Sequence, residues 1–143
     1  MTLTLRWQGV VKGQPRARAT RAGGFVRMYT PDTADAMKAG LVAEAIRQMA
    51  ASGWRRDYDG PVAVTITAIM ARPKAHFLRG KLRENAPKRH AQKPDIDNIE
   101  KAVLDALTKA RVWRDDCQVD WVLKRRMWGW EGEPASLLVE VTQ

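Results

Sequence analysis

Residues 93–128, with the sequence KPDIDNIEKAVLDALTKARVWRDDCQVDWVLKRRMW, predict a helix, a turn and a strand in succession. Pro94 disfavours helical backbone at Lys93, so we expect a helix over residues 95–110. At 100° per residue its apolar side chains fall on one arc, which must face a sheet: Ile99, Ala102, Val103, Ala106, Leu107 and Ala110. The opposite stripe alternates carboxylate, amine and carboxylate, from Asp97, Lys101 and Asp105.

Alternating apolar and polar residues predict strands at residues 2–11 and 61–71. A short apolar run after Gly23-Gly24 predicts a strand at 25–29, and two closing strands are expected at 119–128 and 137–142. A run rich in Ala, Met and Leu at residues 34–51 predicts a second helix, with Thr30 or Asp32 as its cap and a stop near Gly53. Residues 12–21 are interpreted as a basic loop. This order predicts an α/β (α+β) fold, a two-layer sandwich in which a mixed sheet of about four to five strands packs against two main helices.

Length and composition limit the class of protein. A chain of 143 residues that is 45% hydrophobic and 29% charged fits one globular domain, which we take as residues 1–143. Its apolar runs are too short to cross a membrane, and its first residues are typical of a strand rather than a secretion signal. The single cysteine, Cys117, excludes an internal disulfide framework and a cysteine-based zinc site. We therefore expect a cytoplasmic protein.

Charge is distributed unevenly along the chain. Residues 1–94 contain 18 basic and 6 acidic residues, a net charge of +12, whereas residues 95–143 contain 7 basic and 10 acidic residues, a net charge of −3. A basic excess favours a polyanionic partner, most often nucleic acid. We expect two basic segments to bind the phosphate backbone, through Arg16, Arg18, Arg21, Arg72, Lys74, Arg79, Lys81, Arg83, Lys88, Arg89 and Lys93.

The second basic segment, residues 72–93, is unusually long for a loop, which indicates a functional or mobile element. It contains His76 and His90, which we interpret as phosphate contacts or solvated residues. We interpret Cys117 as a small packed side chain. The tryptophans are expected in the core or at a dimer surface rather than on a platform for base stacking: Trp113, Trp121, Trp128 and Trp130.

The acidic residues allow two interpretations. Asp97 with Glu100 is a variant of the capping box, and Lys101 is spaced for i,i+4 ion pairs with both neighbours on its stripe. One cap needs only one acid, however, and Asp95 and Asp97 crowd together at the helix start unless a cation neutralises them. Hard cations such as Mg²⁺ bind carboxylate oxygens. Asp115 and Asp116 also allow two interpretations: they belong either to a solvated turn or to the metal site.

Together these motifs resemble the RusA family of Holliday-junction resolvases, also called crossover junction endodeoxyribonucleases. The resemblance rests on the series K-P-D-x-D-N…K…L-D-A-L…W-x-D-D-x-Q-V at residues 93–119. The basic loop around Pro15 and the run Tyr29-Thr30-Pro31 are similar to phage members of the family. The chain departs from the family at Arg111, where members often carry a glycine, which eases a left-handed helix end.

The resemblance implies a role for each matched residue. Asp95, Asp97 and Asp116 match the catalytic, metal-binding carboxylates of the family, and Lys101 matches its catalytic lysine. The implied cofactor is Mg²⁺, as one or two ions for which Mn²⁺ can substitute, with no small-molecule cofactor. Three further polar residues are expected around this set without touching the metal: Asn98, Asp105 and Asp115.

The resemblance also implies a homodimer that resolves four-way DNA junctions by paired symmetric nicks, in recombination and repair. It further implies a protein of the bacterial cytoplasm, and a phage or prophage gene stays open as its source. We expect the dimer interface on the closing strands, where large side chains lie on both faces: Trp121, Val122, Leu123, Met127 and Trp128. Two other functions stay open, a nuclease acting on flaps or forks, and a module that binds nucleic acid and uses its acids only to cap and solubilise a helix.

Overall fold

A four-stranded mixed sheet forms the centre of the computed structural model, which describes residues 1–15, 17–29 and 34–143. The strands are β1 (Thr2–Gln8), β4 (Val62–Met70), β7 (Val119–Trp128) and β8 (Ser136–Thr142), in the spatial order β1-β8-β4-β7. β8 pairs antiparallel with β1 and with β4, whereas β7 runs parallel to β4. A parallel pair needs a crossover connection, and the chain between β4 and β7 supplies it.

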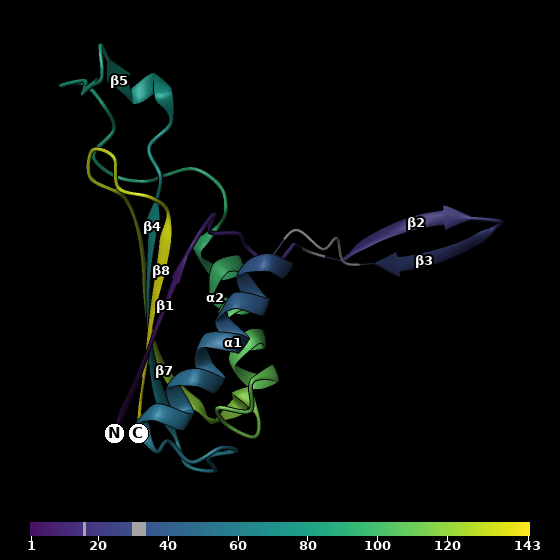
Figure 1. Cartoon of the computed structure of the whole chain (residues 1–143). Helices are drawn as coiled ribbons and strands as arrows, with labels where there is room; N and C mark the ends of the chain where they lie inside the picture. Colours follow the sequence, from purple (N-terminus) through teal and green to yellow (C-terminus); the bar gives the residue numbers. More distant parts are fainter. Residues whose placement is uncertain (16, 30–33) are drawn as a thin grey trace.

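Two helices, α1 (Asp35–Ser52) and α2 (Ile96–Lys109), cover one face of this sheet (Figure 1). α1 ends at Gly53, whose φ of 73° is a left-handed conformation that glycine adopts without strain. The predicted apolar arc of α2 lies in the core, where it meets inward side chains of the sheet such as Leu5, Ile66 and Val139. The polar stripe of α2 is therefore kept on the side of the helix away from the core.

The other face of the sheet has no helix over it in the part of the chain that the structure describes (Figure 1). Three apolar side chains of the edge strand β7 are exposed there: Trp121, Leu123 and Met127. Val122 and Trp128 alternate with them and point to the helix side, where Trp128 is buried and Val122 packs against the core. The bare face thus begins at the sheet edge with a row of large apolar groups.

Two small antiparallel strand pairs lie outside the central sheet (Figure 1). β2 (Arg18–Ala22) and β3 (Phe25–Tyr29) form a hairpin that projects away from the body, and β5 (Phe77–Leu78) pairs with β6 (Lys81–Leu82). The 3-10 helices η1 (Lys74–His76) and η2 (Asp116–Gln118) precede β5 and β7. None of the helices within the described ranges is long and apolar enough to cross a membrane.

The predicted α+β sandwich with a mixed sheet and two main helices is confirmed. The prediction of a loop over residues 12–21 is wrong from Arg18 onward, where β2 begins. β2 carries only Arg, Ala and Thr, so it lacks the large apolar residues by which a strand is recognised. The Gly23-Gly24 turn, with φ of 60° and 83°, is what pairs β2 with β3. The expected cap residues Thr30 and Asp32 lie outside the described residues.

Candidate active site

The start of α2 positions two of the predicted carboxylates. Asp95 is the N-cap residue, with extended backbone at φ −68° and ψ 145°, and Asp97 lies in the first turn. The expected capping box is wrong, because Asp95 rather than Asp97 occupies the cap position and Glu100 forms an ion pair with Lys124 of β7. Both Asp95 and Asp97 are exposed at a helix N-terminus, where the helix dipole favours negative charge.

Asp97, Lys101 and Asp116 line one hollow of about 350 Å³. Glu100, Leu104, Asp105 and Lys124 complete its lining. The stripe predicted on α2 supplies Asp97, Lys101 and Asp105, whereas Asp116 comes from η2, the turn that leads into β7. The fold therefore brings the second acid of the Asp115-Asp116 pair to the acidic face of α2.

Lys101 is the exposed amine of this hollow. Within the described residues, the expected ion pairs of Lys101 with Asp97 and Asp105 are not formed, and Asp105 instead lies 4.0 Å from the Nζ atom of Lys38 on α1. Lys124, the second lysine of the hollow, is paired with Glu100. Lys101 thus shares the hollow with Asp97, Asp105 and Asp116 and forms no ion pair within the described residues.

Asp95 lines a different hollow, of about 870 Å³, together with Lys93, Asn98 and residues 10–15. The described parts of the chain contain no group of three or more His, Cys, Asp or Glu side chains placed to hold a metal ion. The structure accordingly brings Asp97 and Asp116 to one hollow and leaves Asp95 in the neighbouring one. Of the three residues expected around the acids, Asp105 lines the hollow of Asp97, and Asn98 lines that of Asp95.

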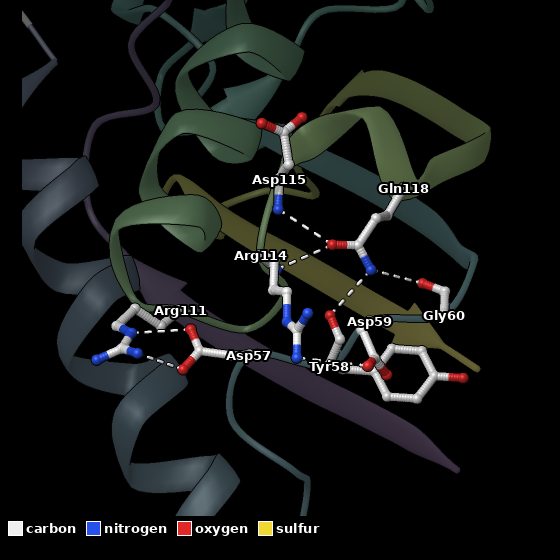
Figure 2. A network of polar contacts seen from close by, with 8 residues as sticks. All are labelled: Asp57, Tyr58, Asp59, Gly60, Arg111, Arg114, Asp115 and Gln118. Atoms are coloured by element: carbon white, nitrogen blue, oxygen red, sulfur yellow. Dashed lines mark hydrogen bonds and ion pairs between the residues drawn. The ribbon is translucent and has the colours of Figure 1, made fainter.

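The side chain of Gln118 fixes the turn that presents Asp116 (Figure 2). Its Oε1 atom accepts hydrogen bonds from the backbone N–H of Arg114 at 2.9 Å and of Asp115 at 3.1 Å. Its Nε2 atom donates to the carbonyls of Tyr58 and Gly60, each at 2.9 Å. The amide thereby uses two donors and two acceptor positions. Asp115 caps η2 by accepting from the N–H of Cys117, which lowers the pKa of Asp115.

The end of α2 is held by an ion pair between Arg111 and Asp57 (Figure 2). Arg111 has a φ of 63°, the left-handed conformation that glycine adopts more easily. Its Nε atom donates to Oδ1 of Asp57 at 2.8 Å, and the N–H of Asp57 donates to the carbonyl of Arg111 at 2.8 Å. The Arg111 guanidinium lowers the pKa of the Asp57 carboxyl. These contacts tie the loop at residues 57–60 to the end of α2.

A known protein family matches almost the whole chain. The model of the family described as Endodeoxyribonuclease RusA matches residues 8–142 of the 143. The chain belongs to the RusA family. The resemblance predicted from residues 93–119 is thereby confirmed, and with it the class of activity, an endodeoxyribonuclease. No curated protein matches the chain.

Three single-residue predictions for this RusA-family chain are wrong. Cys117 is exposed rather than packed, and the Asp115 side chain raises the pKa of its thiol. His76 and His90 are buried, with ring centroids 4.9 Å and 4.3 Å from that of Trp128. Burial, and then the charge of Arg126, lowers the pKa of His90. The two histidines therefore attach the basic segment to the end of β7 rather than facing solvent.

The predicted DNA-binding residues fall into two groups. Arg72 is used internally, since its guanidinium donates to the carbonyls of Gly129 at 3.0 Å and Pro87 at 2.9 Å. Arg83 donates to the carbonyl of Phe77 at 3.2 Å and is nevertheless exposed. Arg16 lies outside the described residues. The remaining members are exposed: Arg18, Arg21, Lys74, Arg79, Lys81, Lys88, Arg89 and Lys93.

Two residues of the site carry a role that the sequence does not assign. Gln118 belongs to the quoted RusA series, and its fixed place after the paired acids is the signal that could have identified it. Lys124 has no such signal, because it is one basic residue among three in an alternating strand. Its pairing with Glu100 links β7 to α2 across the hollow and becomes apparent only from the fold.

Gln118→Ala is expected to lower the free energy of unfolding by about 2–6 kcal/mol, since four hydrogen bonds worth about 0.5–1.5 kcal/mol each are lost. DNA cleavage per folded molecule should also fall, because the turn that carries Asp116 loosens. Urea unfolding and a cleavage assay measure the two effects. Gln48→Ala, which removes a single amide contact to Glu44 on α1, is the control. Unchanged cleavage per folded molecule would show that Gln118 does not position Asp116.

Proposed function

We propose that this chain is a structure-specific endodeoxyribonuclease that resolves four-way DNA junctions by paired symmetric nicks, in recombination and repair. The chain acts as one domain over residues 1–143, in the cytoplasm, where DNA is handled. The observation that carries the proposal is the shared hollow of Asp97, Lys101 and Asp116, which joins two carboxylates and an exposed amine on a chain with a net charge of +9. Such a set can hold a scissile phosphate and activate water against it.

The donor set of the hollow fits Mg²⁺, because it offers carboxylate oxygens and contains neither histidine nor thiol among its lining residues. Asp97 and Asp116 are the proposed metal ligands, and Asp95, two residues before Asp97, is the third. These carboxylates would hold one or two Mg²⁺ ions, or Mn²⁺ in their place, and the bound metal would lower the pKa of a water and screen the charge of the phosphate. Without an added charge, the acids of this hollow repel a DNA phosphate.

Lys101 complements the carboxylates in this proposal. It lies one helical turn after Asp97 on the same stripe of α2, so its ammonium group and the Asp97 carboxylate face the same hollow. A cation near the scissile bond stabilises the charge that develops on the phosphate oxygens and on the leaving oxygen. Lys101 is therefore assigned to transition-state stabilisation rather than to folding.

The exposed basic residues of segment 72–93 are proposed to bind the phosphate backbone. Replacing Arg79, Lys81 and Arg83 together by Ala is expected to weaken DNA binding and to flatten the log–log dependence of affinity on salt by about one unit for each lost phosphate contact. Titrations at several salt concentrations measure the slope. Arg47→Ala, which removes a cation already paired with Glu44, is the control. An unchanged slope in the triple variant would show that DNA binds at another part of the surface.

We propose a homodimer that forms through the bare face of the sheet. Two symmetric nicks need two sites, and a twofold dimer presents two identical ones. The exposed row of Trp121, Leu123 and Met127 supplies the apolar part of the interface. The same face carries Arg125 on β7 and Glu140 on β8, so a twofold axis can pair opposite charges across it.

Trp121→Glu is expected to convert the dimer to a monomer that nicks one strand instead of two. Sedimentation at micromolar concentration measures the mass, and strand-specific labels measure the nicks. Trp130→Glu is the matched control, because Trp130 is 82% exposed and lies beyond the end of β7, outside the strands of the sheet. A wild-type monomer that still makes paired nicks would contradict the dimer.

The function itself is tested on a four-way junction with each strand labelled in turn. We expect symmetric nicks across the branch point, no cleavage with EDTA, and recovery with Mg²⁺ or Mn²⁺. Linear duplex, flap and fork DNA of the same length are the comparison substrates. Faster cleavage of flaps or forks would favour the alternative nuclease, and binding without cleavage of any substrate would favour a module that binds DNA only.

A further inference from the structure

The β2–β3 hairpin projects away from the body of the described structure (Figure 1). Its strands pair with each other from Arg18–Tyr29 to Ala22–Phe25, and the described residues on them pack against no other strand or helix to a comparable extent. Figure 1 shows the ribbon standing away from the sheet and the helices. An isolated two-stranded hairpin is at best marginally stable in water, so a surface that binds its side chains stabilises it.

The side chains of the hairpin indicate the chemistry of that surface. Phe25, Val26 and Met28 are 75%, 62% and 66% exposed, and Arg18, Arg21 and Arg27 are exposed between them. No Asp or Glu occurs between residues 7 and 31. Apolar groups interleaved with guanidinium groups, without any acid, match a polyanion that also offers flat apolar faces. Nucleic acid has both, in its phosphates and in its bases.

The base of the hairpin is fixed beside the acidic end of α2. The N–H of Gln14 donates to the carbonyl of Asn98 at 2.8 Å, and Lys38 of α1 donates to the Gln14 side chain at 3.0 Å. Gly13 packs so closely that a Cβ atom there would lie 2.8 Å from Cβ of Asn98. Arg18 and residues 10–15 line the hollow that also holds Asp95. A DNA strand in this hollow therefore meets the hairpin as it leaves the acids.

We propose that the β2–β3 hairpin is a DNA-binding arm on which Phe25 stacks against a base at the branch point of the substrate. Arg18, Arg21 and Arg27 bind the phosphates on either side of that base. Phe25 follows the Gly23-Gly24 turn directly and is exposed at the tip of the arm. Its ring has no hydrogen-bonding group, so it needs an open base face, which a branch point offers and an intact duplex covers.

The inference rests on the proposed function, because it assumes branched DNA as the ligand. It is tested by the affinity of variants for a four-way junction and for a linear duplex of equal length, in Ca²⁺ to prevent cleavage. Phe25→Ala is expected to weaken junction binding by about tenfold, the size of one base–aromatic stacking contact, and to leave duplex binding unchanged. Phe25→Trp is expected to restore junction affinity.

Two further variants serve as controls. Arg27→Ala should weaken binding to both DNAs and flatten the salt dependence by about one unit. Ile46→Ala, which shortens an exposed apolar side chain on α1, should leave both affinities unchanged. Wild-type junction affinity in Phe25→Ala, or an equal loss of affinity for junction and duplex, would overturn the proposal that Phe25 stacks against a base at the branch point. A wild-type protein that binds and cuts the junction no better than the duplex overturns the proposed function instead.

A photocrosslinker at the tip gives a direct readout of position. With Phe25→p-benzoylphenylalanine, irradiation in the presence of the junction is expected to join residue 25 to nucleotides within the branch. Crosslinks distributed evenly along the arms would overturn the stacking role. Crosslinks to a second copy of the chain, with loss of the dimer in Phe25→Ala, would show that the arm binds protein rather than DNA.

Discussion

Asp97→Asn and Asp116→Asn are each expected to reduce junction cleavage by at least about a thousandfold while leaving junction binding intact. Both carboxylates line the hollow that also contains Lys101, and the amide that replaces them binds Mg²⁺ far more weakly. A loss of several kcal/mol of transition-state stabilisation corresponds to that factor in rate. Binding should be unchanged or tighter, because each substitution removes a negative charge that faces the phosphate backbone.

Asp95→Asn is expected to have the same effect. It is the most informative of the three substitutions, because Asp95 lines the neighbouring hollow rather than the one that Asp97 and Asp116 share. Single-turnover cleavage and gel-shift titrations measure rate and affinity. Asp35→Asn is the matched control, since Asp35 is likewise an exposed acid in the first turn of a helix, α1. Wild-type rates in Asp97→Asn or Asp116→Asn would overturn the assignment, and wild-type rates in Asp95→Asn alone would reduce the proposed metal ligands to two.

The helix that carries the site could be predicted from the sequence because its signals are local. The apolar arc of α2 follows from the helical period, and the same period puts Asp97, Lys101 and Asp105 on one stripe. Strand β4 alternates strongly enough to be recognised in the same way. These features depend on neighbours within one or two turns, so a single sequence contains all of the information needed to find them.

The approach of Asp116 to α2 could not be predicted from local pattern, because it depends on contacts between distant segments. The Gln118 side chain holds η2 by bonding to the carbonyls of Tyr58 and Gly60, which lie 60 and 58 residues away in the chain. Only the resemblance to a known family placed Asp116 with the other acids in advance. The burial of His76 and His90 against Trp128 has the same origin, since a basic loop gives no signal that its histidines will be enclosed.

Lys101→Ala is expected to reduce the rate of cleavage by about a hundredfold to a thousandfold, with little change in stability. The side chain is exposed and forms no ion pair within the described residues, so its removal costs few folding contacts. The loss of one preorganised donor to a developing oxyanion has an effect of that size in other hydrolytic sites. Single-turnover rates and thermal unfolding measure the two quantities separately, and the melting temperature should stay within a few degrees of wild type.

Lys124→Ala provides the contrast within the same hollow. Lys124 is half-buried and paired with Glu100 across the gap between β7 and α2, so its loss should lower stability through the unpaired Glu100 carboxylate. Its rate per folded molecule should change much less than that of Lys101→Ala. The two substitutions remove the same charge from the same hollow. A difference between their cleavage rates must therefore come from the position of the lysine and not from the net charge. Equal rate losses would assign both lysines to a general electrostatic effect, and a large loss of stability in Lys101→Ala with normal turnover would make Lys101 a structural residue.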